Sequence, residues 1–79
     1  MVKVIVFSLN GCKPCEKLKE KLEQEGIPFE EKQIKTFDEL REIDYREFPT
    51  VEIENNGEKI VRSGCSDEVI EEIKRLATD

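Results

Sequence analysis

The sequence predicts one α/β domain, residues 1–79, with the element order β-α-β-α-β-β-α and a four-stranded mixed sheet flanked by three helices. Three observations predict this class. An apolar stretch leads directly into an amphipathic helix, a second strand follows that helix, and an Asn-Gly pair divides a later run of alternating residues into a hairpin. A strand–helix–strand unit followed by a hairpin gives a mixed sheet with helices on both faces.

The first half of the chain contains two predicted strands and one helix. Residues 2–9 (VKVIVFSL) are apolar without polar alternation, which indicates a strand buried on both faces. The helix is predicted to begin near Pro14, because the N–H groups of the first turn have no partner within the helix and Pro, which has no N–H, is therefore tolerated there. It is predicted to end at Gly26. Residues 27–34 (IPFEEKQI) are more polar and indicate an edge strand. The inner face of the helix is predicted to carry Cys15, Leu18 and Leu22.

Two further helices are predicted in the second half of the chain. Thr36 and Glu39 have the spacing of a capping box and begin a short helix that is expected to end near residue 43. Ser66 is expected to cap the last helix, which begins with acidic residues, as the helix dipole favours. The apolar residues of the short helix are expected to face inward: Phe37, Leu40 and Ile43.

The hairpin is predicted between these two helices, in residues 49–63. Apolar and acidic residues alternate before the pair Asn56-Gly57, and that pair suits a two-residue type I′ turn. Such a turn fixes the register of the two strands, because each residue then has one partner across the hairpin. The predicted register places Ile53 opposite Ile60.

The charge of the chain limits its partners. Charged residues make up 41% of the sequence, and the net charge is −6. An acidic chain without a basic stripe is not expected to bind nucleic acid or an anionic membrane. The apolar run at residues 4–9 is too short for a membrane span or a usual signal peptide, so we expect a cytoplasmic, monomeric protein.

Cys12 and Cys15 form a C-x-x-C motif at the junction of a buried strand and a helix. The N–H groups and dipole at a helix N-terminus stabilise an anion, so we expect Cys12 to be partly ionised at neutral pH and to be the attacking thiol. Lys13 and the net positive charge of the first 24 residues act in the same direction. Cys15 lies one turn later on the inner face, where it can attack a mixed disulfide formed on Cys12.

Two alternatives for the thiol pair remain open at this point: a metal or iron–sulfur carrier built on Cys12, and a pair of inert thiols. A tetrahedral zinc site needs four ligands, usually Cys or His. The chain has no His and only three Cys, so carboxylates would have to complete the set, and we predict no metal site. The absence of His also excludes Ser-His and Cys-His hydrolase chemistry.

Two other motifs point to redox chemistry. Pro49 stands at the start of a predicted strand, where a cis peptide bond would leave the backbone of the preceding residue free to pair with a bound peptide. An ordinary trans turn is the alternative. In residues 63–67 (SGCSD), Gly64 allows close backbone approach, and the N–H groups of Ser66 and Asp67 could hold a carboxylate. Plain N-capping is the alternative there.

Together these motifs resemble the glutaredoxin branch of the thioredoxin superfamily, over essentially the whole chain. The resemblance implies a thioredoxin-like, glutaredoxin-type fold and thiol–disulfide oxidoreductase activity with no metal or organic cofactor. It implies that Cys12 is the nucleophile and Cys15 the resolving thiol, and that Pro49 is cis and lines the substrate groove. The other substrate-binding positions that it implies are Lys13, Pro14, Phe48 and Thr50 beside the groove, and Gly64, Cys65, Ser66 and Asp67 around the γ-glutamyl end of glutathione.

The sequence also departs from the family pattern. Lys13-Pro14 replaces the usual Pro-Tyr between the cysteines, Glu47-Phe48 replaces Thr-Val, and Ser63 replaces the first of two glycines. A basic residue before the first cysteine is missing. Ser63 followed by glycine is similar to the redoxins that feed ribonucleotide reductase and take electrons from thioredoxin reductase. We therefore expect disulfide-containing proteins as substrates, and either glutathione or a thioredoxin reductase as the electron donor.

Overall fold

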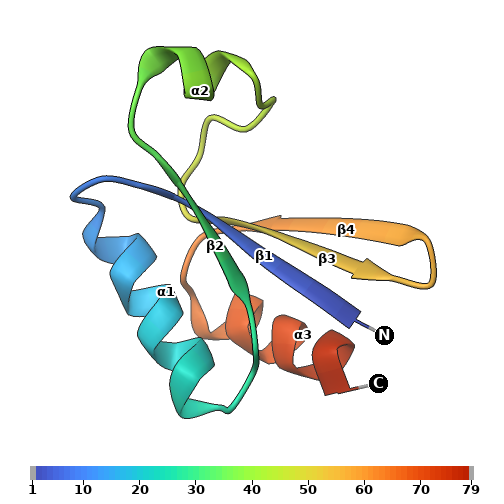
Figure 1. Ribbon diagram of the computed structural model, residues 1–79. Coiled ribbons are helices and arrows are strands. Elements are labelled where there is room, and N and C mark those ends of the chain that lie inside the picture. Colours follow the sequence, from blue (N-terminus) through green and yellow to red (C-terminus); the bar gives the residue numbers. More distant parts are fainter. Residues whose placement is uncertain (1, 79) are drawn as a thin grey trace.

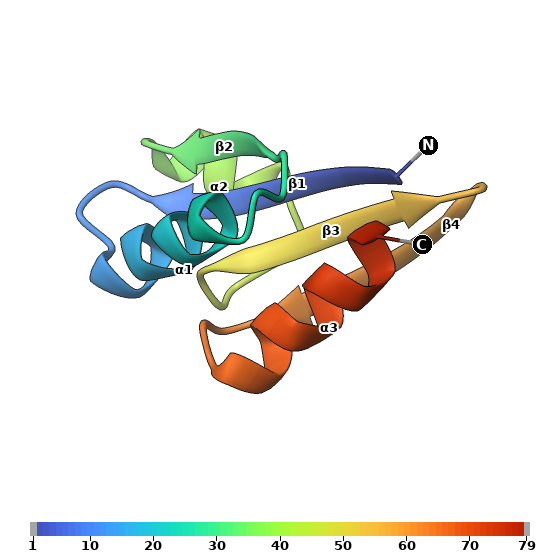
Figure 2. The ribbon, with the colours of Figure 1, turned by 90° about the horizontal axis from the view of Figure 1, so that it is seen from below.

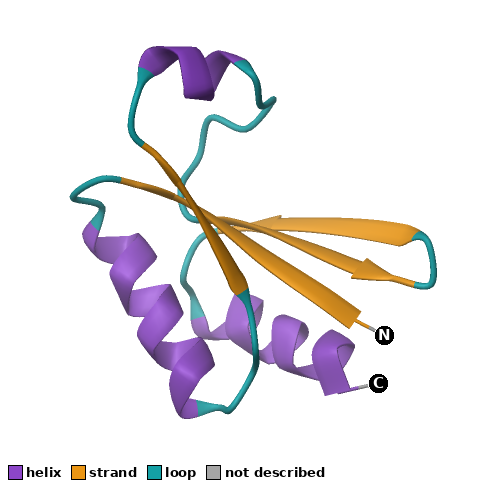
Figure 3. Cartoon of the chain, in the orientation of Figure 1, coloured by secondary structure: helices purple, strands orange, loops and turns teal. Residues whose placement is uncertain are grey.

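The computed structural model describes residues 2–78. Within them the elements follow the predicted order (Figure 1). The strands are β1 (Val2–Leu9), β2 (Glu30–Ile34), β3 (Thr50–Asn55) and β4 (Glu58–Ser63), and the helices are α1 (Lys13–Gln24), α2 (Phe37–Arg41) and α3 (Asp67–Thr78). Figure 3 shows the same chain coloured by secondary structure, with a short connection before α2 and a longer loop, residues 42–49, after it.

The strands form one mixed sheet in the order β2-β1-β3-β4. β1 is parallel to β2 and antiparallel to β3, and β3 is antiparallel to β4. Helices α1 and α3 cover one face of the sheet, whereas α2 lies on the other side, near the end of β2 (Figures 1 and 2). The predicted mixed sheet with helices on both faces is therefore confirmed, as is the position of β2 at an edge.

The main core lies between the sheet and the two helices α1 and α3. Its side chains are aliphatic, and Leu18, Leu22 and Ile53 are fully buried. The predicted inner face of α1 is thus confirmed. The complete buried cluster consists of Val4, Val6, Leu18, Leu22, Ile27, Val51, Ile53, Ile70 and Ile73.

The hairpin has the predicted register, with Ile53 opposite Ile60. Asn56 and Gly57 both have positive φ angles, 54° and 84°, as a type I′ turn requires. Glu52 points to the face of the sheet opposite the main core but is only 8% exposed. The cost of burying this carboxylate is offset by the hydrogen bond that the Tyr45 hydroxyl donates to it and by the Lys59 ammonium 3.4 Å away.

The second strand begins three residues later than the sequence predicts. Gly26, at φ 71°, follows α1, and its N–H donates to the Glu23 carbonyl while the Ile27 N–H donates to the Leu22 carbonyl. These are the two hydrogen bonds of a Schellman motif. Residue 27 therefore belongs to the helix cap, where its side chain packs into the core, and only residues 30–34 pair with β1.

The inward orientation predicted for Phe37 is wrong. Thr36 is confirmed as the N-cap, because the Glu39 N–H donates to its hydroxyl at 3.2 Å, but the Glu39 carboxylate accepts from the Lys35 N–H and not from the Thr36 N–H as a full capping box requires. However, α2 ends after five residues and none of them is buried. Phe37, the first residue of this short helix, is 80% exposed, while Leu40 is half-buried.

Substitutions of Leu18 and Phe37 should have very different effects on stability. Leu18→Ala leaves a cavity in the main core and should lower the free energy of unfolding by about 2–5 kcal/mol. Phe37→Ala removes an exposed ring and should change it by no more than about 0.5 kcal/mol. Urea denaturation followed by circular dichroism measures both. A large loss in the Phe37 variant would contradict the outward orientation of this ring.

Glu31 should make stability depend on pH in the acid range. Its carboxylate accepts hydrogen bonds from the Lys19 ammonium and from the buried Ser8 hydroxyl. Lys19 lowers the pKa of Glu31 most strongly, and Ser8 acts in the same direction against the effect of burial. A carboxyl whose pKa is lower in the folded state stabilises the protein above its unfolded pKa, and this stability is lost as the pH falls through the folded pKa.

Glu31→Gln should therefore flatten the fall in unfolding free energy that occurs below about pH 4.5. The measurement is urea denaturation at a series of pH values. Glu30→Gln is the matched control, because Glu30 is adjacent but lies 3.8 Å from its ion-pair partner Lys3 and is well exposed. An equal change of slope in both variants would show that the Ser8–Glu31–Lys19 contacts do not cause the dependence.

Candidate redox site

Three segments of the chain meet at one end of the sheet. β1 ends at Leu9 and leads into the loop that carries Cys12, β3 begins at Thr50 directly after Pro49, and β4 ends where the segment GCSD begins. β3 lies between β1 and β4, and Thr50 is the register partner of Phe7 on one side and of Ser63 on the other. The sheet therefore brings together the three motifs that were predicted to carry the redox chemistry.

Cys12 is the N-cap residue of α1. Its backbone is extended, at φ −82° and ψ 108°, and its Sγ atom accepts a hydrogen bond from the Cys15 N–H at 3.2 Å. Its own N–H donates to the Leu9 carbonyl at 3.2 Å, which closes the turn formed with Gly11, at φ 78°. The sulfur thus takes the place of a capping oxygen, at the point where a helix best stabilises an anion.

Cys12 and Cys15 form a disulfide, with their Cα atoms 5.3 Å apart. The two residues differ in exposure. Cys12 is half-buried, whereas Cys15 is only 1% exposed and packs on the inner side of α1. An external thiol or disulfide can therefore reach Cys12 but not Cys15. Lys13 and Pro14, which lie between them, are exposed.

The Phe48–Pro49 peptide bond is cis, as the sequence analysis predicted. Pro49 is buried, Phe48 is half-buried, and the Pro49 carbonyl accepts a hydrogen bond from the Gly64 N–H at 2.9 Å. Gly64 has φ 96°, a conformation that a residue with a Cβ atom rarely adopts. This hydrogen bond joins the cis-proline turn directly to the start of the GCSD segment.

Side chains on the face of the sheet opposite the main core hold the cis-proline turn in place. The Thr50 hydroxyl donates to the Glu47 carbonyl, and the Ser63 hydroxyl donates to the Glu47 carboxylate at 2.9 Å. The Tyr45 ring packs edge-on against Phe7, with 5.3 Å between ring centroids. Burial raises the pKa of Tyr45, and the hydrogen bond from its hydroxyl to the Glu52 carboxylate raises this pKa further.

Sequence reasoning missed the contribution of Tyr45, because nothing in the pattern of residues around it predicts a partner. Its hydroxyl bonds to Glu52, a residue of β3 that the alternation of the hairpin identifies only as facing away from the main core. The one available signal is that Tyr45 is the only tyrosine of the chain and stands four residues before Pro49.

The GCSD segment, residues 64–67, leads into α3, which begins at Asp67. The Ser66 hydroxyl accepts a hydrogen bond from the Val69 N–H at 3.4 Å, so the predicted N-cap is confirmed. Asp67 has a side chain that is 92% exposed and lies 3.7 Å from the Lys21 ammonium of α1. Cys65 is half-buried and packs against the core. The glutathione contacts that the resemblance implies for these residues stay predictions.

Two negative findings concern the part of the chain that the structure describes. Within residues 2–78, no group of three or more His, Cys, Asp or Glu side chains is arranged so that it could hold a metal ion. None of the helices described there is both long enough and apolar enough to cross a membrane.

Comparisons with known proteins agree with this arrangement. A family model, Glutaredoxin, matches residues 4–60. No curated protein matches the sequence. Similar solved structures include thioredoxin from Malassezia sympodialis, with 23% identity and a TM-score of 0.66 over 99% of this chain and 76% of that chain. Thioredoxin from Fasciola hepatica has 19% identity and a TM-score of 0.68, over 96% of this chain and 80% of that chain.

A maleylacetoacetate isomerase from Anaeromyxobacter dehalogenans, solved with bound glutathione, has a TM-score of 0.74 at 10% identity. The match covers 99% of this chain but only 39% of the isomerase. At these identities the solved structures show the fold alone, which is thioredoxin-like. The family model spans more than half of the chain, including both cysteines of the motif and the cis-proline, and this protein therefore belongs to the glutaredoxin family.

Proposed function

We propose that this protein is a dithiol oxidoreductase of the cytoplasm that reduces disulfides in proteins and mixed disulfides between proteins and glutathione. One observation carries the proposal: Cys12 is accessible at the N-terminus of α1 and is disulfide-bonded to the buried Cys15. A reducing compartment keeps such a pair in the dithiol form, in which it can act on substrates.

The reaction consists of two thiol–disulfide exchanges. The Cys12 thiolate attacks one sulfur of the substrate disulfide, whose S–S bond breaks, and the departing thiolate takes a proton from water. Cys15 then loses its proton and attacks the Cys12 sulfur, which releases the second substrate thiol and forms the Cys12–Cys15 disulfide. The substrate gains two electrons, and the protein loses two.

Each exchange uses a feature of the site. The Cys15 N–H bonds to the Cys12 sulfur, so the thiolate is stabilised before it attacks. Cys15 is shielded from the substrate but lies within bonding distance of Cys12, so the second exchange is intramolecular and fast. In this proposal the substrate backbone lies along the cis-proline turn, beside Phe48 and Thr50.

We propose glutathione as the electron donor: two molecules reduce the disulfide and leave as glutathione disulfide. The N–H groups at the start of α3 suit a carboxylate, and the Asp67 carboxylate suits an amine, so together they suit a γ-glutamyl end. A thioredoxin reductase is the second candidate. It is favoured by the Glu47 carboxylate, which Ser63 holds beside the cis-proline turn, because glutathione is negatively charged.

Substitution of each cysteine in the motif should have a distinct result. Cys12→Ser should reduce turnover of hydroxyethyl disulfide to the uncatalysed rate, because no nucleophile remains. Cys15→Ser should instead accumulate a mixed disulfide on Cys12, because the second exchange is blocked. Mass spectrometry of the trapped adduct locates the bond. An adduct on Cys65, or full turnover by the Cys12 variant, would refute the assignment of roles.

Asp67→Ala should weaken reduction by glutathione and leave reduction by dithiothreitol unchanged. Loss of one exposed ion pair is worth about 1 kcal/mol at most, so the rate with glutathione should fall by about threefold to fivefold. Asp38→Ala is the matched control, since Asp38 is equally exposed and carries the same charge but lies on α2. If both donors lose the same factor, GCSD acts only as a helix cap.

The midpoint potential distinguishes the two electron donors independently. A potential of about −200 to −230 mV is that of a glutaredoxin and is compatible with reduction by the glutathione pool. A potential near about −270 mV is that of a thioredoxin, and a dedicated reductase would then be the better donor. Equilibration of the protein with defined ratios of reduced and oxidised dithiothreitol gives the value.

A further inference from the structure

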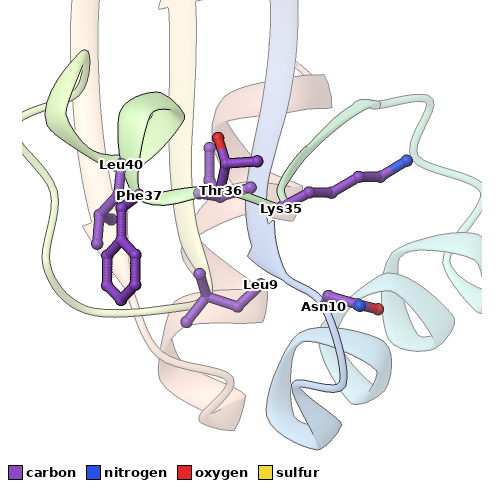
Figure 4. Close-up of a pocket in the computed structure, with 7 residues that line it drawn as sticks. Leu9, Asn10, Lys35, Thr36, Phe37 and Leu40 are labelled. Carbon is purple, nitrogen blue, oxygen red and sulfur yellow. The ribbon is translucent and has the colours of Figure 1, made fainter.

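An apolar hollow lies between the end of β1 and the start of α2. Three large apolar side chains in the described part of the chain are exposed, and two of them, Leu9 (36%) and Phe37 (80%), line this hollow. Its volume is about 280 Å³. Figure 4 shows the Leu9 and Phe37 side chains approaching each other from opposite sides, with Leu40 above them. We call this hollow the Leu9–Phe37 pocket.

The Leu9–Phe37 pocket directly adjoins the redox loop. Asn10, which lines it, and Leu9 are the residues that lead from β1 to Cys12. The Leu9 carbonyl accepts the hydrogen bond of the Cys12 N–H, at 3.2 Å, so one wall of the pocket belongs to the turn that carries the reacting sulfur. A protein whose disulfide is attacked by Cys12 must therefore cover part of the surface around this pocket.

The chemistry of the lining selects the kind of group that fits. The walls are the hydrocarbon side chains of Leu9, Ile34, Phe37 and Leu40, and the lining contains no carboxylate. Lys35 supplies the single charge, and Figure 4 shows its side chain extending away from Phe37 and Leu9. An apolar side chain gains most from such walls, because it removes hydrocarbon surface from water on both partners.

We infer that the Leu9–Phe37 pocket binds an apolar side chain, such as Leu or Met, of the protein whose disulfide reacts with Cys12. The inference rests on the proposed function. Leu9 and Asn10 of the lining stand three and two residues before Cys12, and an extended substrate chain advances about 3.3 Å per residue, so the side chain should lie about two to four residues from the reacting cysteine of the substrate. Glutathione has no side chain of this kind, so the pocket favours protein disulfides over glutathione disulfides.

The experiment compares two peptides that differ at one position. Each carries one cysteine in a mixed disulfide with the same small thiol, and Leu or Ser stands at a fixed spacing of two, three or four residues from that cysteine. At the best spacing the wild-type protein should reduce the Leu peptide with a kcat/KM about tenfold higher, which is the discrimination that a modest apolar contact supplies.

Phe37→Ser should lower this ratio to about one without unfolding the protein, because the ring is exposed. Val61→Ser is the matched control: Val61 is 37% exposed, close to the 36% of Leu9, but lies on β4 outside the pocket. The control should keep the tenfold ratio. Loss of the ratio in both variants would mean that any apolar surface suffices, and would overturn the assignment to this pocket.

Other outcomes overturn the inference in distinguishable ways. Reduction of both peptides at equal rates, at every spacing, would leave the oxidoreductase intact and remove only the role of the pocket. Failure to reduce either peptide would overturn the proposed function and the inference with it. If analytical ultracentrifugation shows that the wild type is a dimer and that the Phe37→Ser variant is a monomer, the pocket binds a second copy of this chain and the inference is overturned.

Discussion

Burial of β1 on both faces is the constraint on which the rest of the structure depends. One face of β1 supplies Val4 and Val6 to the core beneath α1 and α3, and the other supplies Phe7 to the contact with Tyr45. Because β1 pairs with β2 on one side and β3 on the other, it cannot shift without breaking both ladders. The loop that follows it is therefore held at a fixed place, beside the start of β3.

The same constraint explains how a short chain with a small core can hold Cys12 in a fixed position. Position is supplied by backbone hydrogen bonds: Cys12 to the Leu9 carbonyl, and Gly64 to the Pro49 carbonyl. In the proposed reaction the N-terminus of α1 offsets the charge of the Cys12 thiolate, because the Cys15 N–H bonds to that sulfur.

The order of elements, the cis-proline and the turn register were predictable because each rests on a few local residues. The start of β2 was harder to predict. Ile27 looks like the first residue of a strand in the sequence, but its N–H forms one of the Schellman hydrogen bonds that end α1. The outward orientation of Phe37 and the burial of Glu52 were not predictable for a different reason. Their exposure depends on how far α2 extends and on where Tyr45 folds back, and both are long-range outcomes that periodicity does not record.

The sheet order gives the redox site two sides of different character. α2 follows β2, at one edge, whereas GCSD follows β4, at the other edge, and Cys12 is reached from β1 between them. The β4 side carries the start of α3 and the exposed Asp67, to which we assign glutathione in the proposed reaction. The β2 side offers the hydrocarbon walls of Leu9 and Phe37, which suit a side chain of a folded protein. In the proposed reaction an electron donor and a protein substrate react with the same sulfur in turn, and we propose that each is recognised by its own surface.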